Sequence, residues 1–272
     1  MRDRQLLRRI PRIRRARGYR LYDMQGRRYL DLFREGALLG HRGARSLTAM
    51  KSTLSQGLSA ALPSVWEKRL LAALARSFPR YSEIRLYASQ DRALDAVCRC
   101  LGGRPAAMYD PALGDIPGDS ATVGFWRPFL PHAERVRVLL LLLPFTVVGA
   151  PAPACFAGEV PSAVPPSDTI PAFVLAGAVS GFSGFSRAIE TGSPLSNPAV
   201  EKSLDAAPGW VRAGPYVHAV FPEEEYPRVH AEFLREGVLL HPGYPGPSVL
   251  PGDCSPGETR LLVDLFTGFP GG

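Results

Sequence analysis

The sequence predicts an α/β protein with a large domain and a small α+β carboxy-terminal part, and three observations indicate this. A capping box over Ser64–Glu67, followed by apolar residues at helical spacing, predicts a helix that Pro79 ends. Residues 84–88 are typical of a short strand, and a helix is expected to follow over 91–101. The apolar run 136–143 is typical of a buried parallel strand.

Further elements are expected on both sides of this region. Towards the amino terminus, the pattern predicts a hairpin turn at Asp23–Gly26 and a helix over 44–56. Towards the carboxy terminus it predicts a strand over 216–221, a helix over 223–236 capped by Gly237, a strand over 238–240, and a last helix that a capping box at Ser255–Glu258 opens. Residues 149–171 are rich in Pro, Ala and Gly and are expected to be the weakest part of the fold, and 173–179 form a second apolar run.

Composition excludes several classes of protein. The chain has 272 residues, of which 46% are apolar and 21% charged, so it can bury a sizeable core and is not generally disordered. Its four cysteines have neither CxxC spacing nor a histidine at zinc-ligand spacing, so we expect no metal and reduced thiols in a cytoplasmic protein. The longest apolar run, 136–149, is shorter than the ~20 residues that cross a bilayer, and no membrane partner is expected.

Positive charge is concentrated at the amino terminus. The net charge is +7, and residues 2–20 carry nine arginines. One interpretation is an arm that binds nucleic acid or an anionic surface. The other is a solvated lead-in segment whose Leu6, Leu7, Ile10 and Ile13 pack on the body of the protein. Because no aromatic platform is interleaved with the arginines, the second is favoured and nucleic acid is not expected as a partner.

A series of short motifs resembles a known family. In order, these are Gly18, Leu21-Tyr22-Asp23, Gly26, Tyr29-Leu30-Asp31, Gly40-His41, Pro63, Glu67, Phe78-Pro79 and Ile84-Arg85-Leu86. The series is similar in order and spacing to the amino-terminal part of class III pyridoxal-phosphate aminotransferases, in particular glutamate-semialdehyde aminomutase. The last 60 residues resemble the small domain of that family, whereas the region between is much shorter than in catalytic members.

The resemblance implies an architecture and an assembly. It implies a large domain like that of the fold-type I pyridoxal-phosphate enzymes, with a truncated middle, and a small carboxy-terminal domain. We therefore expect an amino-terminal arm and small-domain segment over 1–60, the large domain over 61–205 and the small domain over 206–272. Class III aminotransferases are generally dimers, so an apolar patch from residues 30–60 is expected between two subunits.

The family's chemistry requires a phosphate loop, which this chain has changed. Catalytic members have Ser-Gly-Thr-Glu-Ala between a strand and a helix, and the matching stretch here is Ser89-Gln90-Asp91-Arg92-Ala93. The side chain of Gln90 hinders the close approach of a ligand to the backbone. The carboxylate of Asp91 is expected to cap the helix and repel a phosphate.

The Schiff-base lysine is also missing where the resemblance places it. In the family it follows an apolar strand inside a Gly-Lys-x-x-Gly turn, and the comparable stretch here is 173–181, which puts Ala178 at the lysine position. Lys51 and Lys68 are expected to be surface charges, which leaves Lys202 as the one other candidate.

The two remaining groups that hold the cofactor in the family have poor matches. The ring carboxylate corresponds to Gly158, with Asp168 as an alternative, and the stacking aromatic has no clear match, Tyr109 being a poor candidate.

These losses predict a degenerate, catalytically inactive aminotransferase-like protein that acts by binding. No catalytic residue and no cofactor are expected, with Ser89, Gln90, Asp91, Gly158 and Ala178 as vestigial positions. Its partners would be a second copy, an aminotransferase-like protein or a small amino-acid metabolite. Two alternatives stay open: an active pyridoxal-phosphate-dependent aminotransferase or aminomutase with a displaced lysine, and an anionic-polymer binder that uses the arginine segment.

Overall fold

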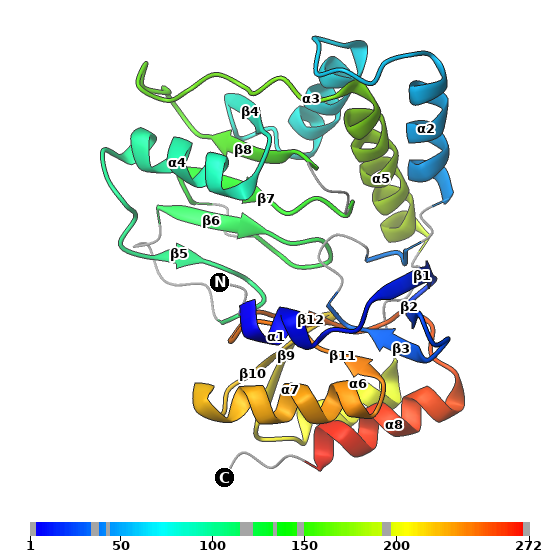
Figure 1. Ribbon diagram of the computed structural model, residues 1–272. Coiled ribbons are helices and arrows are strands. Elements are labelled where there is room, and N and C mark those ends of the chain that lie inside the picture. Colours follow the sequence, from blue (N-terminus) through cyan, green and yellow to red (C-terminus); the bar gives the residue numbers. More distant parts are fainter. Residues whose placement is uncertain are drawn as a thin grey trace. The chain divides into compact units, whose positions relative to one another are not determined.

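Two compact units make up the chain. The computed structural model describes residues 4–33, 38–41, 44–114, 122–132, 135–145, 150–191 and 197–268 (Figure 1). Unit 1 combines residues 1–42 with 192–272, and unit 2 spans 43–191. Each unit has its own hydrophobic core.

Unit 2 is built on a five-stranded sheet with the strand order β4-β8-β7-β6-β5. Its strands are β4 (Glu83–Tyr87), β5 (Met108–Tyr109), β6 (Val123–Trp126), β7 (Val138–Leu141) and β8 (Ala152–Phe156). Its helices are α2 (Ala44–Ser55), α3 (Val65–Ser77), α4 (Gln90–Leu101) and α5 (Ala172–Glu190). The predicted α/β class and the buried strand in the run 136–143 are therefore confirmed.

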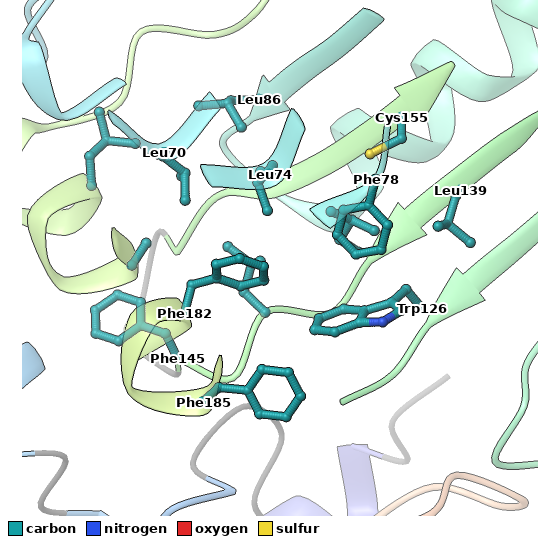
Figure 2. Close-up of a cluster of buried hydrophobic side chains, with 14 of the residues drawn as sticks. Leu70, Leu74, Phe78, Leu86, Trp126, Leu139, Phe145, Cys155, Phe182 and Phe185 are labelled. Atoms are coloured by element: carbon teal, nitrogen blue, oxygen red, sulfur yellow. The ribbon is translucent and has the colours of Figure 1, made fainter. Parts of the chain in front are cut away.

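Side-chain alternation along β7 shows how the layers pack. Val138 and Leu140 belong to a buried cluster with α4, whereas Leu139 and Leu141 belong to a second cluster with α3 and α5. All four residues are buried, as expected for a strand that helices cover on both faces. Figure 2 shows the second cluster, in which Leu70 and Leu74 of α3 and Phe182 and Phe185 of α5 are drawn with Leu139 and Trp126.

The stretch 149–171, expected to be the weakest part of the fold, contains the strand β8 between β4 and β7. That expectation was wrong, because all five residues of β8 are buried. A proline inside a sheet is unusual since it lacks an N–H donor. Pro153 is tolerated here because the pairing of β8 with β7 ends at Ala154.

The apolar run 173–179 is helical and not a strand. It lies in the first half of α5, which contacts both α2 and α3. Gly177 allows this packing, because a Cβ there would lie 2.8 Å from Cγ of Met50 and would overlap the ring of Phe145. α5 is long and apolar enough to cross a membrane. Its buried residues pack in the core of unit 2, however, and a helix buried in a core has the same length and apolar composition as a membrane-spanning one.

The first predicted capping box is not formed. Ser64 is the N-cap of α3, but its side chain makes no capping hydrogen bond, and its Oγ is buried without a partner among the described residues. The helix itself runs as predicted and ends at Ser77, just before Phe78-Pro79.

Unit 1 contains two small sheets and four α-helices among its described residues. One sheet has the order β1-β2-β3-β11 and the other β12-β10-β9. The strands are β1 (Ile13–Arg17), β2 (Arg20–Asp23), β3 (Arg28–Asp31), β9 (Trp210–Ala213), β10 (Tyr216–Ala219), β11 (Val238–Leu239) and β12 (Ser248–Val249). The helices are α1 (Arg4–Arg9), α6 (Pro198–Asp205), α7 (Tyr226–Arg235), preceded by the 3-10 turn Glu223–Glu225, and α8 (Pro256–Thr267).

The sequence motifs of the amino-terminal segment meet in unit 1. β2 and β3 form the predicted hairpin, and Gly26 in its turn has φ +84°. The N–H of His41 donates to the carbonyl of Gly18 at 2.7 Å, and its Nε2 lies 2.5 Å from Oδ2 of the buried Asp31. A Cβ at Gly40 would lie 3.0 Å from the Gly18 carbonyl oxygen, so these two glycines permit a close backbone approach.

Candidate functional site

The carboxyl ends of four strands of unit 2 lie at one edge of the sheet. β5, β6 and β7 are parallel, and β8 is antiparallel to both β7 and β4, so β4 runs in the direction of β5 to β7. In open α/β sheets, ligands bind in the crevice outside the carboxyl ends of parallel strands. The residues that follow each of these strands are therefore the candidates for a ligand site.

The turn after β4 is the stretch that matched the phosphate loop. It connects β4 to α4 through Ala88 and Ser89, the strand–loop–helix context that was predicted. Ser89 is the N-cap, and its Oγ accepts the N–H of Arg92 at 3.2 Å. Asp91 lies exposed in the first turn and does not cap the helix, so that part of the prediction was wrong. Its charge still opposes a phosphate at this helix start.

Asp168 brings a second carboxylate to the same turn. Its Oδ2 accepts the N–H of Ala88 at 2.9 Å, and its Oδ1 accepts Nη2 of Arg92 at 2.7 Å. These bonds, the Arg92 bond first, lower the pKa of Asp168, although its partial burial opposes the shift. Asp168 is therefore an ionised partner of Arg92 and of the Ala88 N–H, and its alternative assignment as the carboxylate of a pyridine ring stays a prediction.

An ion pair fills the edge beyond β5 and β6. Asp110 follows β5 directly and Arg127 follows β6 directly. The guanidinium donates twice to the carboxylate, from Nε at 2.6 Å and from Nη2 at 2.7 Å. Their side chains are 12% and 14% exposed, so the two charges neutralise each other in a largely dry environment. Sequence reasoning missed this pair, although each residue ends a short apolar strand.

Apolar side chains follow β7. Leu143 and Phe145 are buried, and the Phe145 ring fills the space beside Gly177 of α5. No amine lies in the sequence from Leu142 to Gly149, which connects β7 to the region of β8. The end of β7 therefore offers no lysine that could form a Schiff base.

All three lysines of the chain lie on exposed positions of helices. Lys51 is in α2, Lys68 in α3 and Lys202 in α6. Lys202 belongs to unit 1, and neither Lys51 nor Lys68 follows a strand of the sheet. A lysine that follows a strand and reaches the carboxyl edge is thus absent from the sequence.

The structure does not place Ala178 or Gly158 where the sequence predicted. Ala178 is fully buried inside helix α5, and not in the turn after a strand, so the basis for equating it with the lysine was wrong. Gly158 follows β8, whose carboxyl end lies beside Glu83 at the amino end of β4. Because β8 is antiparallel to its neighbours, Gly158 lies at the opposite edge of the sheet from the turn after β4. Its φ of +82° explains the glycine.

The remaining candidates do not add chemistry to this edge. Tyr109 is buried in the core cluster that includes Trp126. Within the described part of the chain, no three His, Cys, Asp or Glu side chains gather as metal ligands would. The residues at this edge thus fit pyridoxal phosphate poorly: no lysine follows these strands, and the Ala88 N–H and the Arg92 guanidinium are already bonded to Asp168.

Comparisons with known proteins show what the chain resembles. No protein-family model matches it. An uncharacterised protein of Treponema pallidum (strain Nichols) is 28% identical over 296 residues, which cover 91% of each chain. A glutamate-1-semialdehyde 2,1-aminomutase of Syntrophus aciditrophicus is 31% identical over 97 residues, 35% of this chain and 22% of that protein.

Solved structures show the fold. An ornithine δ-aminotransferase of Plasmodium falciparum superposes with a TM-score of 0.70 at 14% identity, over 95% of this chain and 92% of the other. An omega-transaminase from Sphaerobacter thermophilus superposes with a TM-score of 0.62 at 16% identity, over 95% and 90%. The chain therefore has the fold of class III aminotransferases, as the sequence resemblance implied.

Proposed function

We propose that this protein has an aminotransferase fold without transaminase activity, and that it acts by binding. The observation that carries the proposal is the absence of any lysine after a strand of the sheet, since the three lysines lie exposed on α2, α3 and α6. A transaminase needs that amine to hold the cofactor and to move a proton. The ion pairs Asp168–Arg92 and Asp110–Arg127 support the same conclusion, because they neutralise the polar groups of the edge.

The partner we expect is a second copy, an aminotransferase-like protein or a small amino-acid metabolite. An amino-acid ligand is supported by the solved structures that share the fold, since several of them are ornithine aminotransferases.

An absorbance scan with added pyridoxal phosphate tests the loss of activity. The purified protein is expected to show no aldimine band, and borohydride reduction followed by peptide mass spectrometry is expected to find no pyridoxyl-lysine. A reduced adduct on Lys202 would establish the alternative, an enzyme with a displaced lysine. Adducts that are equal on Lys51, Lys68 and Lys202 would indicate unspecific reaction with surface amines and would leave the proposal intact.

The arginine segment supports a second candidate function, binding of an anionic polymer. Arg14, Arg15 and Arg17 of β1 are exposed, on the outer strand of its sheet, and carry no ion pair among the described residues. Leu6 is buried at 2% exposure, as the lead-in interpretation predicted, whereas Ile13 is exposed at 37%. If the arginines contact phosphates, the affinity for RNA should fall steeply as the salt concentration rises. The logarithm of the binding constant should fall with the logarithm of the salt concentration with a slope of about −0.7 per phosphate contact. Binding that is weak and independent of salt would exclude this function.

A further inference from the structure

The segment after β8 returns along the free side of β4. The N–H of Leu86 donates to Oγ of Ser167 at 3.1 Å, and the N–H of Asp168 donates to the Leu86 carbonyl at 2.8 Å. Nη1 of Arg85 donates to the carbonyls of Val164 and Pro165 at 2.6 and 2.8 Å. These bonds cover an edge strand, and they also fix the backbone of residue 168 beside the carboxyl end of β4.

These hydrogen bonds place the carboxylate of Asp168 at the start of α4. Asp168 accepts three hydrogen bonds there, from the N–H of Ala88 at 2.9 Å and from Nη2 and Nε of Arg92 at 2.7 and 3.3 Å. A backbone N–H at a strand-to-helix turn and a guanidinium in the first turn of the helix are the donors that bind phosphate groups in proteins. In this chain they are bonded to an anion that belongs to the chain itself.

We propose that Asp168 is an internal replacement for a phosphate group, which occupies the anion site at the start of α4 and closes it to phosphorylated ligands. The inference rests on the proposed loss of cofactor binding and gives that loss a cause. Asp91 reinforces it, because a second carboxylate in the same turn repels an incoming phosphate.

The proposal predicts a gain of binding when the carboxylate is removed. Asp168→Ala frees the Ala88 N–H and the Arg92 guanidinium, so we expect inorganic phosphate to bind this variant about tenfold more tightly than the wild type, or better. Calorimetric or ³¹P line-width titrations at constant ionic strength, with chloride as the balancing anion, measure this. Asp168→Asn keeps the shape of the side chain and should show a smaller gain, so it serves as the test variant if Asp168→Ala does not fold.

Two controls separate the site from general charge effects. Asp95→Ala makes the same change in net charge within helix α4 and frees Arg99, which pairs with Asp95 at 3.0 Å. It lies away from the helix start and should gain no phosphate affinity. Adding Arg92→Gln to Asp168→Ala should abolish the gain, because the guanidinium is the principal donor.

The outcomes are decisive. A wild-type protein that binds phosphate as tightly as Asp168→Ala, or an equal gain in Asp95→Ala, would overturn the proposal. Failure of the proposed function would give a different result, a pyridoxyl-lysine in the wild-type protein after borohydride reduction. That adduct requires a reactive lysine and does not depend on whether Asp168→Ala gains phosphate binding.

Discussion

Gly177 shows at the scale of one residue why α5 can pack where it does. A Cβ at this position would lie 2.8 Å from Met50 Cγ and from Phe145 Cε2 and would overlap the tip of the Phe145 ring. The contact joins residues from three separated segments, so no local sequence pattern indicates it. By contrast, Ser89–Ala93 could be found from the sequence because the motif is local, whereas its partner Asp168 lies 76 positions away from Arg92.

Replacing Gly177 should therefore destabilise the protein. We expect Gly177→Ala to lower the free energy of unfolding by about 1–3 kcal/mol, because an overpacked core must shift its side chains. Gly184→Ala is the matched control on the same helix, since a Cβ there would meet nothing within 4 Å. It should stabilise the protein by about 0.5–1 kcal/mol through helix propensity. Urea unfolding of both variants measures this, and equal effects would contradict the packing argument.

Glu258 carries a second residue-scale prediction, about pH. Burial raises the pKa of this carboxyl, but hydrogen bonds from Arg20 at 2.8 and 2.6 Å and from the Ser255 N–H outweigh burial and hold the pKa at about 2. A depressed pKa contributes stability above the unfolded value near 4.5, and this contribution is lost as the pH falls towards 2. Glu258→Gln should thus cost about 3 kcal/mol near pH 7.

The difference between wild type and Glu258→Gln should shrink below about pH 4.5. Urea unfolding of both proteins from about pH 7 to about pH 3 tests the sign. A difference that stays constant over this range would show that packing, and not the charge, explains the loss.

At the scale of elements, helix starts and strand edges differ in how well a sequence predicts them. Both capping boxes have the same local pattern, but only that of Ser255 and Glu258 forms both of its hydrogen bonds. The run 173–179 was misassigned because a short apolar run does not distinguish a buried strand from a buried helix. β8 was missed because its proline and alanines have low strand propensity, although all of its side chains are buried.

The two helix starts should respond differently to the same substitution. Ser255→Ala removes an acceptor for the Glu258 N–H and should cost about 1 kcal/mol. Ser64→Ala removes a buried hydroxyl oxygen that has no partner and should cost less, or stabilise the protein. Thermal unfolding of the two variants is the measurement, and a larger loss for Ser64→Ala would mean that a capping bond forms there in solution.

At the scale of the whole molecule, the fold could be predicted but the arrangement of its middle could not. The amino-terminal motifs contact one another in the fold, as Gly18, Gly40 and His41 show. Their order and spacing could therefore be recognised in the sequence. The middle consists of the short strands β5 to β8 and the helix α5, and no sequence motif records which apolar run is a strand, which is a helix, or how the strands pair. Alignment of Gly158 and Ala178 by spacing failed for that reason.

Exposed apolar residues lead to the last prediction, that the protein forms a homodimer. Of the expected patch over 30–60, Leu30 and Leu32 are buried within unit 1, so they are not available. The exposed residues lie on α2, on α3 and in the segment between them: Leu47, Leu54, Leu58, Leu62 and Val65, which are 38–60% exposed. Such a concentration of exposed large apolar side chains within one stretch of the chain is expected at an interface.

Sedimentation at micromolar concentration should therefore show a dimer. A Leu54→Glu/Leu58→Glu variant should be a folded monomer, because two charges would have to be buried without partners in the interface. Val220→Glu, in unit 1 and 46% exposed before substitution, should leave the dimer intact. A wild-type monomer would contradict the prediction, and dissociation by Val220→Glu would place the interface elsewhere, on the surface of unit 1.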